Sequence, residues 1–468
     1  MRRWLKIVLI VVVALLLLVL AAGLFVRNAI VGSLPQLEGE VRVAGLASTV
    51  TIERDTLGVP TIRGETRADV ARALGFVHAQ DRFFQMDLLR RKGAGELSEL
   101  FGAATLETDR DARLHGFRAV AHKVVQGLPE KHRRLLDAYV EGVNAGLASL
   151  DQDPFEYLLL RLDPEPWREE DSVLVLYAMY FELNDSHGSR ESARGLLADL
   201  IDPELAAFLV PRGTSWDAPL DGGTMDVPPL PGTPTTGLQP PPAGMATEEE
   251  TAAAVVGSNN WAVAGSRTAD GRAILADDMH LGLSLPNTWF RVTMGWPTGG
   301  GDAYRRITGI TLPGSPALVA GSNSSVAWGF TNSYGDWSDL VILEIDGEQY
   351  LTPDGPRDFE IRTETIEVRG GEPAIFEARW TIWGPVVDQD YLGRPRALRW
   401  IAHSTEGANL GFFEIEEAST IDEAMAAANR TGIPPQNFVC ADSTGRIGWT
   451  IIGSIPNRQG FSGLVPTS

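Results

Sequence analysis

The sequence predicts an α+β protein, with helices dominating the first half of the chain and antiparallel strands the second. Between residues 116 and 210, apolar side chains recur at the three- and four-residue spacing of a helix, as in Leu135, Leu136, Tyr139, Val140 and Val143. From 341 to 400 they alternate as they do in strands, and a proline-rich linker at 221–257 separates the two regions.

Composition narrows the class of protein. A chain of 468 residues exceeds one ordinary core, so we expect two or three lobes or one large body. The net charge is −21 and no basic cluster follows the N-terminus, which argues against a nucleic-acid partner. The single cysteine, Cys440, lies in an apolar run and is predicted to be a small buried residue rather than a nucleophile.

The N-terminus predicts a membrane segment. Arg2, Arg3 and Lys6 precede an uncharged apolar run, residues 7–26, that would be about 30 Å long as a helix. We interpret residues 1–30 as a signal anchor, a transmembrane helix with its positive flank in the cytoplasm. A cleaved signal peptide ending near Ala21 is the alternative. Both place the remaining chain on the extracytoplasmic side of the membrane.

Residues 45–215 are predicted to form a mainly helical region. Two short strands, at 50–55 and 57–62, come first, and Thr66 is expected to cap the helix that follows. That helix carries the polar segment 78–87, His-Ala-Gln-Asp-Arg-Phe-Phe-Gln-Met-Asp. We expect Asp81 and Arg82 to form a buried network that orients the helix, which is a structural role.

Residues 216–257 are predicted to be a spacer. They contain several proline pairs, a run of three glutamates and an alanine-rich approach to Gly257, a composition that cannot bury enough apolar surface to fold alone. The spacer stops abruptly at Ser258, where β-forming residues begin. This change in composition indicates a processing site between Gly257 and Ser258.

The residues after the spacer predict a β-hairpin. Apolar runs at 261–264 and 273–276 flank Asp270-Gly271, a strong hairpin-turn signal. A two-residue turn there would set residue 269 opposite 272 and Trp261 opposite His280. His280 would then lie about 10 Å from Ser258 along the ladder, so a bulge or an oblique contact would be needed to join them.

Cleavage before Ser258 would create a self-sufficient nucleophile. The new α-amino group has an ordinary pKa of about 8 and can accept the proton of its own side-chain hydroxyl. No separate His–Asp pair is then needed. The sequence offers neither a Gly-x-Ser-x-Gly elbow nor a His-Glu-x-x-His motif for other hydrolytic routes.

These motifs resemble those of the penicillin acylase family of N-terminal-nucleophile hydrolases. The resemblance runs from about Val50 to Gly460 and includes Ser258-Asn259-Asn260-Trp261, segment 78–87 and the block at 321–332. It implies an αββα core of two stacked antiparallel sheets flanked by helices. It also implies Ser258 as nucleophile, His280 orienting its amine, and the main-chain N–H of Asn332 binding the oxyanion.

The resemblance further implies a substrate pocket and a metal site. Three apolar residues would contact the acyl group: Leu183, Leu281 and Phe413, although the sequence favours a core role for Phe413. Four residues would hold a structural calcium ion through oxygen atoms: Glu191, Asp336, Ser338 by its carbonyl, and Asp339. Solvated turn and helix carboxylates are the alternative for this set. No cofactor is expected for catalysis.

The function expected from this resemblance is that of a self-processing acylase. It would hydrolyse the amide of a small N-acyl substrate such as a β-lactam, an acyl-homoserine lactone or a lipopeptide, and it would work as two fragments of one chain. His280 and Leu281 favour acyl-homoserine lactone, lipopeptide or cephalosporin substrates over phenylacetyl compounds.

The C-terminal region leaves a second reading open. In the family the second chain continues beyond the point matching Ser468 and supplies an asparagine side chain to the oxyanion. Residues 258–468 are therefore expected to be a C-terminally incomplete catalytic region. The alternative is a membrane-tethered binding protein of the same fold that does not mature.

Overall fold

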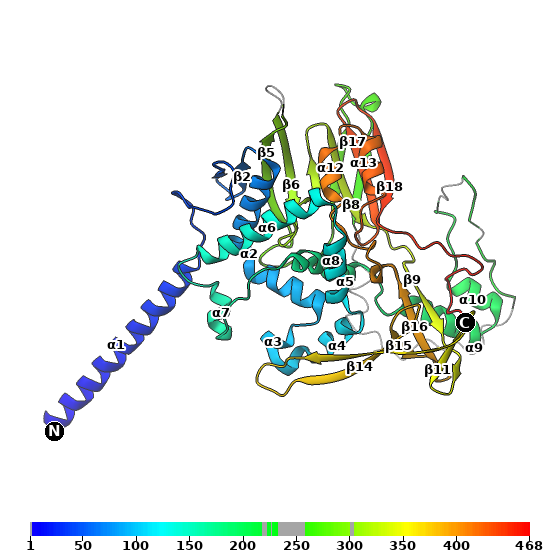
Figure 1. Cartoon of the computed structure of the whole chain (residues 1–468), viewed down its shortest axis with the longest axis horizontal. Helices are drawn as coiled ribbons and strands as arrows, with labels where there is room; N and C mark the ends of the chain where they lie inside the picture. Colours follow the sequence, from blue (N-terminus) through cyan, green and yellow to red (C-terminus); the bar gives the residue numbers. More distant parts are fainter. Residues whose placement is uncertain (1, 218–221, 226, 233–257, 300–303) are drawn as a thin grey trace.

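The structure is a computed structural model that describes residues 2–217, 222–225, 227–232, 258–299 and 304–468. A long N-terminal helix projects from the body of the molecule. The body consists of a large sheet, a group of helices and several small β-hairpins (Figure 1). Most helices come from the first half of the chain and most strands from the second, so the expected α+β class is confirmed. Most of the predicted spacer, including Gly257 and the predicted cleavage point, lies outside the described residues.

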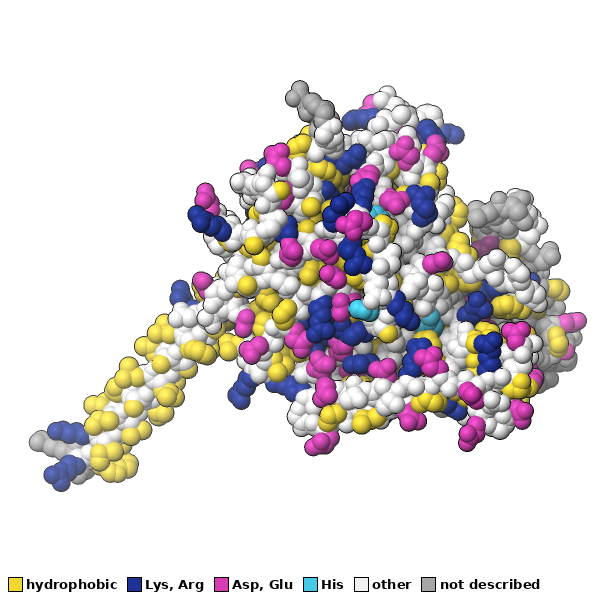
Figure 2. All heavy atoms as spheres, viewed as in Figure 1, with side chains coloured by type: hydrophobic (Ala, Val, Ile, Leu, Met, Phe, Trp, Pro, Cys, Tyr) yellow, Lys and Arg dark blue, Asp and Glu magenta, His cyan; other side chains and the backbone are white. Residues whose placement is uncertain are grey.

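Helix α1 (Arg2–Gly32) projects away from the body. Its segment Arg3–Gly32 has a mean hydropathy of 3.4 over its most apolar window, and none of that window is buried by the rest of the chain. Figure 2 shows hydrophobic side chains along its length and basic side chains at its free end. The helix is long and apolar enough to cross a bilayer, although a signal sequence has the same properties.

Strands β1 (Thr51–Arg54) and β2 (Pro60–Arg63) pair before the first long helix of the body, α2 (Arg67–Ala94). As expected, Thr66 caps α2 by accepting a hydrogen bond from the Asp69 N–H. Asp81 has a structural role, because its carboxylate binds the Arg54 guanidinium at 2.9 and 3.0 Å. This ion pair joins α2 to β1.

Further helices follow α2 in the first half of the chain, and the last two of them lie beside the small strands near the C-terminus rather than against α2 (Figure 1). These helices are α3 (Ser98–Phe101), α4 (Leu106–Leu114), α5 (Phe117–Gly127), α6 (Glu130–Ala148), α7 (Phe155–Leu160), α8 (Glu169–Leu183), α9 (Ser189–Leu200) and α10 (Pro203–Leu209). Helices α2 and α6 touch backbone to backbone: a Cβ atom on Gly142 would lie 1.9 Å from the Arg72 carbonyl oxygen. This contact is possible only without a side chain at 142.

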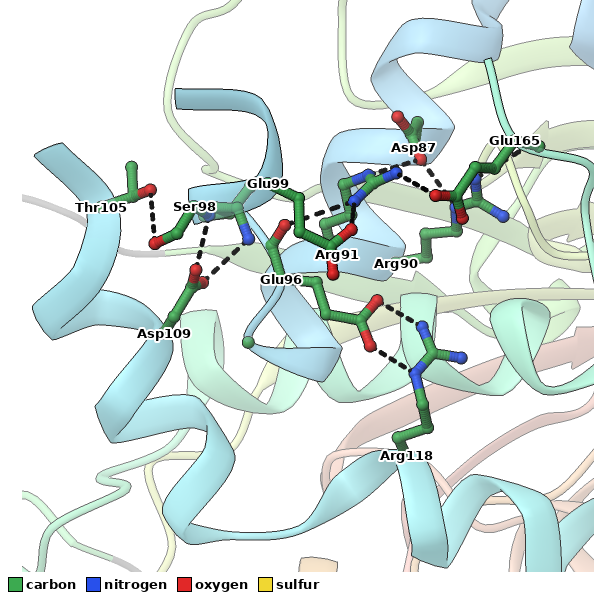
Figure 3. Close-up of polar contacts among 12 residues, drawn as sticks. Asp87, Arg90, Arg91, Glu96, Ser98, Glu99, Thr105, Asp109, Arg118 and Glu165 are labelled. Atoms are coloured by element: carbon green, nitrogen blue, oxygen red, sulfur yellow. Dashed lines mark hydrogen bonds and ion pairs between the residues drawn. The ribbon is translucent and has the colours of Figure 1, made fainter. Parts of the chain in front are cut away.

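A buried charge network holds these helices together (Figure 3). The fully buried Asp87 accepts hydrogen bonds from Arg90 Nε at 2.7 Å, Arg91 Nε at 3.0 Å and the Tyr157 hydroxyl at 2.7 Å. Arg90 also binds Asp171 at 2.6 Å, which links α2 to α8. Because each buried charge has an opposite partner, the helices can pack without leaving an ion desolvated and alone.

The main sheet has eight strands in the order β1-β2-β5-β6-β7-β8-β17-β18. Its later members are β5 (Phe290–Pro297), β6 (Tyr304–Thr311), β7 (Leu318–Ser322), β8 (Val326–Asn332), β17 (Gln436–Asp442) and β18 (Ile447–Ile452). Neighbours are antiparallel except β2 and β5, which run parallel with Thr61 opposite Thr293. The prediction of purely antiparallel sheets is therefore wrong at this pair, where a strand from the helical half joins the sheet.

The two faces of this sheet are covered differently. Strands β3 (Asn259–Val263) and β4 (Ile274–Asp278) form a separate hairpin, and Gly329 of β8 faces Asp277 of that hairpin. Phe330, on the opposite face, packs against Phe412 with ring centroids 5.9 Å apart. Phe412 begins α12 (Phe412–Glu417), which precedes α13 (Ile421–Ala428). The described layer over the hairpin face of β8 is thus two-stranded.

The other strands form smaller sheets at the lower edge of Figure 1. They are β9 (Ser338–Ile342), β10 (Ile345–Asp346), β11 (Gln349–Thr352), β12 (Gly355–Asp358), β13 (Glu360–Ile366), β14 (Ala374–Trp380), β15 (Val386–Gln389) and β16 (Pro395–Trp400). All pair antiparallel, as their alternating sequence predicts. Strand β9 matters most for the candidate metal site, because it begins with two of the candidate ligands, Ser338 and Asp339.

We expect Asp87→Ala to lower the free energy of unfolding by about 3–5 kcal/mol, because Arg90 and Arg91 lose a shared buried partner. Urea denaturation measures this change. The matched control is Glu107→Ala, which removes a carboxylate from an exposed pair with Arg110. That variant should lose less than about 1 kcal/mol. Equal losses for the two variants would contradict a stabilising role for the network.

Candidate active site

The β3–β4 hairpin has a different register from the predicted one. Asn259 lies opposite Asp278 and Trp261 opposite Ala276, so the expected pairing of Trp261 with His280 is wrong by four residues. The strands are joined by a loop at 264–273 rather than by a two-residue turn at Asp270-Gly271. Within it, the Thr268 hydroxyl bonds the carbonyls of Gly265 and Arg272 at 3.0 and 2.8 Å. This register places residues 279 and 280 beside Ser258.

Ser258 meets the main chain of His280. Its Oγ accepts a hydrogen bond from the His280 N–H at 3.2 Å. The His280 ring instead pairs with Asp278, with Nε2 and Oδ2 2.8 Å apart. The backbone of His280, not its imidazole, therefore positions the serine hydroxyl.

A cavity of about 290 Å³ opens at Ser258. It is lined by five of the residues predicted from the sequence: Ser258, His280, Leu281, Leu183 and Asn332. Its further lining is mostly apolar, with Met179, Met279, Trp289, Val319 and Tyr334 beside Glu182, Gly282 and Gln436. Segments far apart in sequence, α8, the hairpin and the end of β8, thus bring a hydroxyl group to the wall of an apolar pocket.

Asn332 joins two walls of this cavity. Its side-chain Nδ2 donates to the Leu183 carbonyl at 2.9 Å and so links the end of β8 to the end of α8. Asn437 Nδ2 donates to the Asn332 carbonyl at 3.4 Å. The side chain of Asn332 is thus occupied in holding Leu183 at the cavity, and the role predicted for Asn332 concerns its main-chain N–H.

Phe413 does not line the cavity, which corrects its candidate role in substrate binding and confirms the core role that the sequence favoured. Only 2% of its surface is exposed. It packs against His132, with ring centroids 5.6 Å apart, and the Arg67 guanidinium lies 5.3 Å from its ring centre. The reason is its place in α12, the helix whose Phe412 packs on the face of β8 opposite the hairpin.

The sequence did not reveal what fixes the hairpin in place. Asn260 Nδ2 donates to the carbonyls of Gly329 and Asn437, at 3.3 and 3.4 Å, and so ties β3 to both β8 and β17. Asp277 faces Asn260 across the hairpin, and a Cβ atom on Gly329 would lie 2.6 Å from its Cγ. The sequence pattern that could have revealed this role is the two-residue spacing of Asn260 from Ser258, because residues two apart in a strand lie on the same face.

Asp277 is a carboxylate in an unfavourable environment. Neither oxygen makes a hydrogen bond of ordinary geometry. The pKa of Asp277 is raised to about 7, mainly by burial; the nearby Phe330 N–H offsets part of this effect, and the charge of Asp278 adds to it. The group is therefore poised to change charge near neutral pH, next to the strand that carries Ser258.

The candidate calcium ligands lie together but are already engaged. Glu191 Oε2 accepts from the Leu340 N–H at 2.7 Å, and its Oε1 is buried without a hydrogen-bond partner. Arg458 Nε binds Asp339 Oδ1 at 2.7 Å, and Arg458 Nη2 contacts Asp336 and the Ser338 carbonyl. In this arrangement, three of the four candidate ligands bind the guanidinium group of Arg458. Calcium binding stays a prediction that these contacts argue against.

Together, the fold and the cavity define an α+β protein whose candidate active site is centred on a serine at the open end of a β-hairpin. A family model described as penicillin amidase matches residues 49–468. The chain belongs to this family.

Curated relatives agree with the family. The chain is 32% identical to acyl-homoserine lactone acylase QuiP of Pseudomonas aeruginosa, over 93% of this chain and 53% of the relative. It is 33% identical to penicillin acylase 2 proenzyme of Pseudomonas sp. (strain SE83), over 94% and 57%. Penicillin G acylase of Escherichia coli is 22% identical, over 88% and 54%. The chain spans about half the length of these relatives.

Among solved structures, the thermostable penicillin G acylase from Alcaligenes faecalis is similar, with 25% identity and a TM-score of 0.38. That match covers 44% of this chain and 38% of the other.

We expect Asp277→Asn to remove a pH dependence of stability. A carboxyl group whose pKa is raised by folding binds more protons in the folded state, so its contribution falls as pH rises from about 4 to about 7. Between pH 5 and pH 8 the wild-type chain should lose about 1–2 kcal/mol relative to the variant, after allowance for solvent screening. Urea denaturation at both pH values measures the difference.

The control for this prediction is Asp278→Asn, which removes an exposed carboxylate from the neighbouring position. It should alter the pH profile by less than about 0.5 kcal/mol. A wild-type profile that does not differ from that of Asp277→Asn would mean that Asp277 is solvated in the folded chain.

Proposed function

We propose that this chain is part of a self-processing acylase that hydrolyses the amide bond of N-acyl substrates, with Ser258 as its nucleophile. The observation that carries the proposal is the position of Ser258. Its Oγ is held by the His280 N–H at 3.2 Å, at the wall of the cavity that Leu183, Leu281 and Asn332 also line. Membership of the penicillin amidase family supports the same reaction class.

Maturation is the first step of this mechanism. Cleavage of the peptide bond between Gly257 and Ser258 gives the serine a free α-amino group. An ordinary α-amine has a pKa of about 8, so a useful fraction is neutral at physiological pH and can accept a proton. The name of one relative, a proenzyme, supports cleavage of this kind.

Acyl transfer follows from the groups around the serine. The α-amine takes the Oγ proton while Oγ attacks the substrate carbonyl, and the carbonyl oxygen becomes an oxyanion that the Asn332 main-chain N–H stabilises. The amine then returns the proton to the leaving nitrogen as the C–N bond breaks, which leaves an acyl-serine ester. Water, deprotonated by the same amine, releases the acid. One aimed oxyanion donor lowers the barrier by about 3–4 kcal/mol.

The cavity favours an aliphatic acyl group. Met179, Leu183, Met279 and Leu281 provide apolar, adaptable walls. Relatives named as acyl-homoserine lactone acylase and as penicillin acylase support N-acyl substrates. We place acyl-homoserine lactones and similar lipid-like amides first, and β-lactams second.

The N-terminal helix suggests where the reaction takes place. Helix α1 would anchor the chain in the membrane with its basic end in the cytoplasm and the body on the extracytoplasmic side. The substrate would then be met outside the cytoplasm, next to a bilayer in which acyl amides concentrate.

We expect the expressed wild-type chain to yield two fragments by intact-mass spectrometry, one of them beginning at Ser258. Ser258→Ala should give a single uncut chain, because it lacks the hydroxyl that attacks the preceding peptide bond. Ser266→Ala, an exposed serine in the loop of the same hairpin, is the matched control and should be cut like the wild type.

The outcome separates the acylase from the binding protein of the same fold. A wild-type chain that stays whole and binds N-acyl compounds without releasing acid would support the binding protein. A whole chain that nevertheless hydrolyses amides would overturn the amine-based mechanism.

We expect His280→Ala to slow processing by less than about tenfold, because the contact with Ser258 Oγ uses the main-chain N–H, which alanine retains. The rate of appearance of the two fragments measures the effect. Asp278→Asn, which removes the partner of the His280 ring, should behave in the same way. If His280→Ala is as inert as Ser258→Ala, the ring has a direct role.

A further inference from the structure

The side chain of Arg458 reaches the oxygen atoms that a metal ion would be expected to bind. Its Nε lies 2.7 Å from Asp339 Oδ1, and its Nη2 lies 3.2 Å from Asp336 Oδ2. The same Nη2 donates to the main-chain carbonyls of Asp336 and Ser338, at 3.2 and 3.3 Å. Four oxygens from three neighbouring residues therefore face one guanidinium group.

The chemistry of this arrangement suits arginine. A guanidinium group is planar, permanently charged and able to direct several N–H groups at carboxylate and carbonyl oxygens at once. A calcium ion needs six to eight oxygens about 2.3–2.6 Å away. A calcium ion bound to these same oxygens would place two cations next to each other, so the ion and the guanidinium group compete for the site.

The Arg458 side chain is largely buried and is covered by a later segment of the chain. Arg458 is only 17% exposed, and Asp339 only 6%. Gly463 passes over the guanidinium so closely that a Cβ atom there would lie 2.2 Å from Nε, and its φ of +69° also favours glycine. Expelling Arg458 would therefore disturb the segment that covers it.

The covering segment is itself attached to β9. Thr467 donates to the Leu340 carbonyl at 3.0 Å, and its own carbonyl accepts from the Ile342 N–H at 2.7 Å. Leu340 N–H, in turn, binds Glu191 of α9. Arg458 therefore stands where α9, the start of β9 and the C-terminal segment meet.

We propose that Arg458 is the built-in cation of this site, and that it replaces a bound calcium ion in neutralising Asp336 and Asp339. The inference goes beyond the proposed acylase activity, because it concerns folding and holds whether or not Ser258 is the nucleophile. The unpartnered Glu191 Oε1 is a feature that favours an additional ion. The experiment therefore measures the response to calcium directly.

The test is the melting temperature of the full chain in a chelator and in millimolar calcium, with magnesium as the comparison ion. A ligand that binds only the folded state raises the melting temperature with its concentration. The wild type should change by less than about 1 °C. Arg458→Ala should melt several degrees lower in chelator and recover part of that loss with calcium, because the freed oxygens can then bind the ion.

Two controls make the result specific. Arg446→Ala breaks an exposed pair with Asp422 and should show neither the loss nor the calcium response. Arg458→Lys keeps the charge without the planar fork and should fall between wild type and Arg458→Ala. If Arg458→Ala does not fold, isothermal titration of the wild type with calcium still decides. Stoichiometric binding, or a wild-type shift of several degrees, would overturn the proposal.

Discussion

The contact between the β3–β4 hairpin and the main sheet is the constraint on which the candidate active site depends. The Asn260 amide reaches carbonyls on two strands of the sheet, Gly329 on β8 and Asn437 on β17. At the other end of the hairpin, Gly265 N–H donates to the Gly445 carbonyl at 2.8 Å. Ser258 immediately precedes β3, so these contacts fix where its hydroxyl lies relative to Asn332 and the wall of the cavity.

The close approach of Gly329 to Asp277 explains why the site contains a buried carboxylate without a hydrogen bond of ordinary geometry. No side chain fits between β8 and β4 at this point, so Asp277 lies against the backbone of the sheet, where water is largely excluded. An amide at this position would avoid burying a charge. The chain therefore keeps, in the β3–β4 hairpin at the candidate active site, a group whose ionisation is unfavourable in the folded state.

Much of this organisation could be predicted from local patterns. The hairpin and the cap at Thr66 followed from alternation, turn signals and short motifs, whereas the predicted cavity residues Leu183, Leu281 and Asn332 followed from the resemblance to the family. The register could not, because a loop held by Thr268 and by the contact of Gly265 with Gly445 overrides the turn preference of Asp270-Gly271. That contact joins segments far apart in the sequence.

The other differences have the same physical origin. A phenylalanine such as Phe413 suits a substrate pocket and a core equally well in its chemistry. The packing of α12 places Phe413 in the core. Arg458 lies 119 residues from its partner Asp339, so no spacing rule links them. The parallel pairing of β2 with β5 likewise joins the two halves of the chain.

That parallel pair determines what a cut in the backbone would do to the molecule. Strand β2 precedes the spacer, yet it lies within the sheet that also holds β5 to β18, and the helices of the first half share one hydrophobic core with that sheet. Cleavage of the chain ahead of Ser258 would break one covalent bond and leave the pairing of β2 with β5 and the shared core in place. The two products would migrate separately in detergent but travel through a sizing column as a single noncovalent heterodimer.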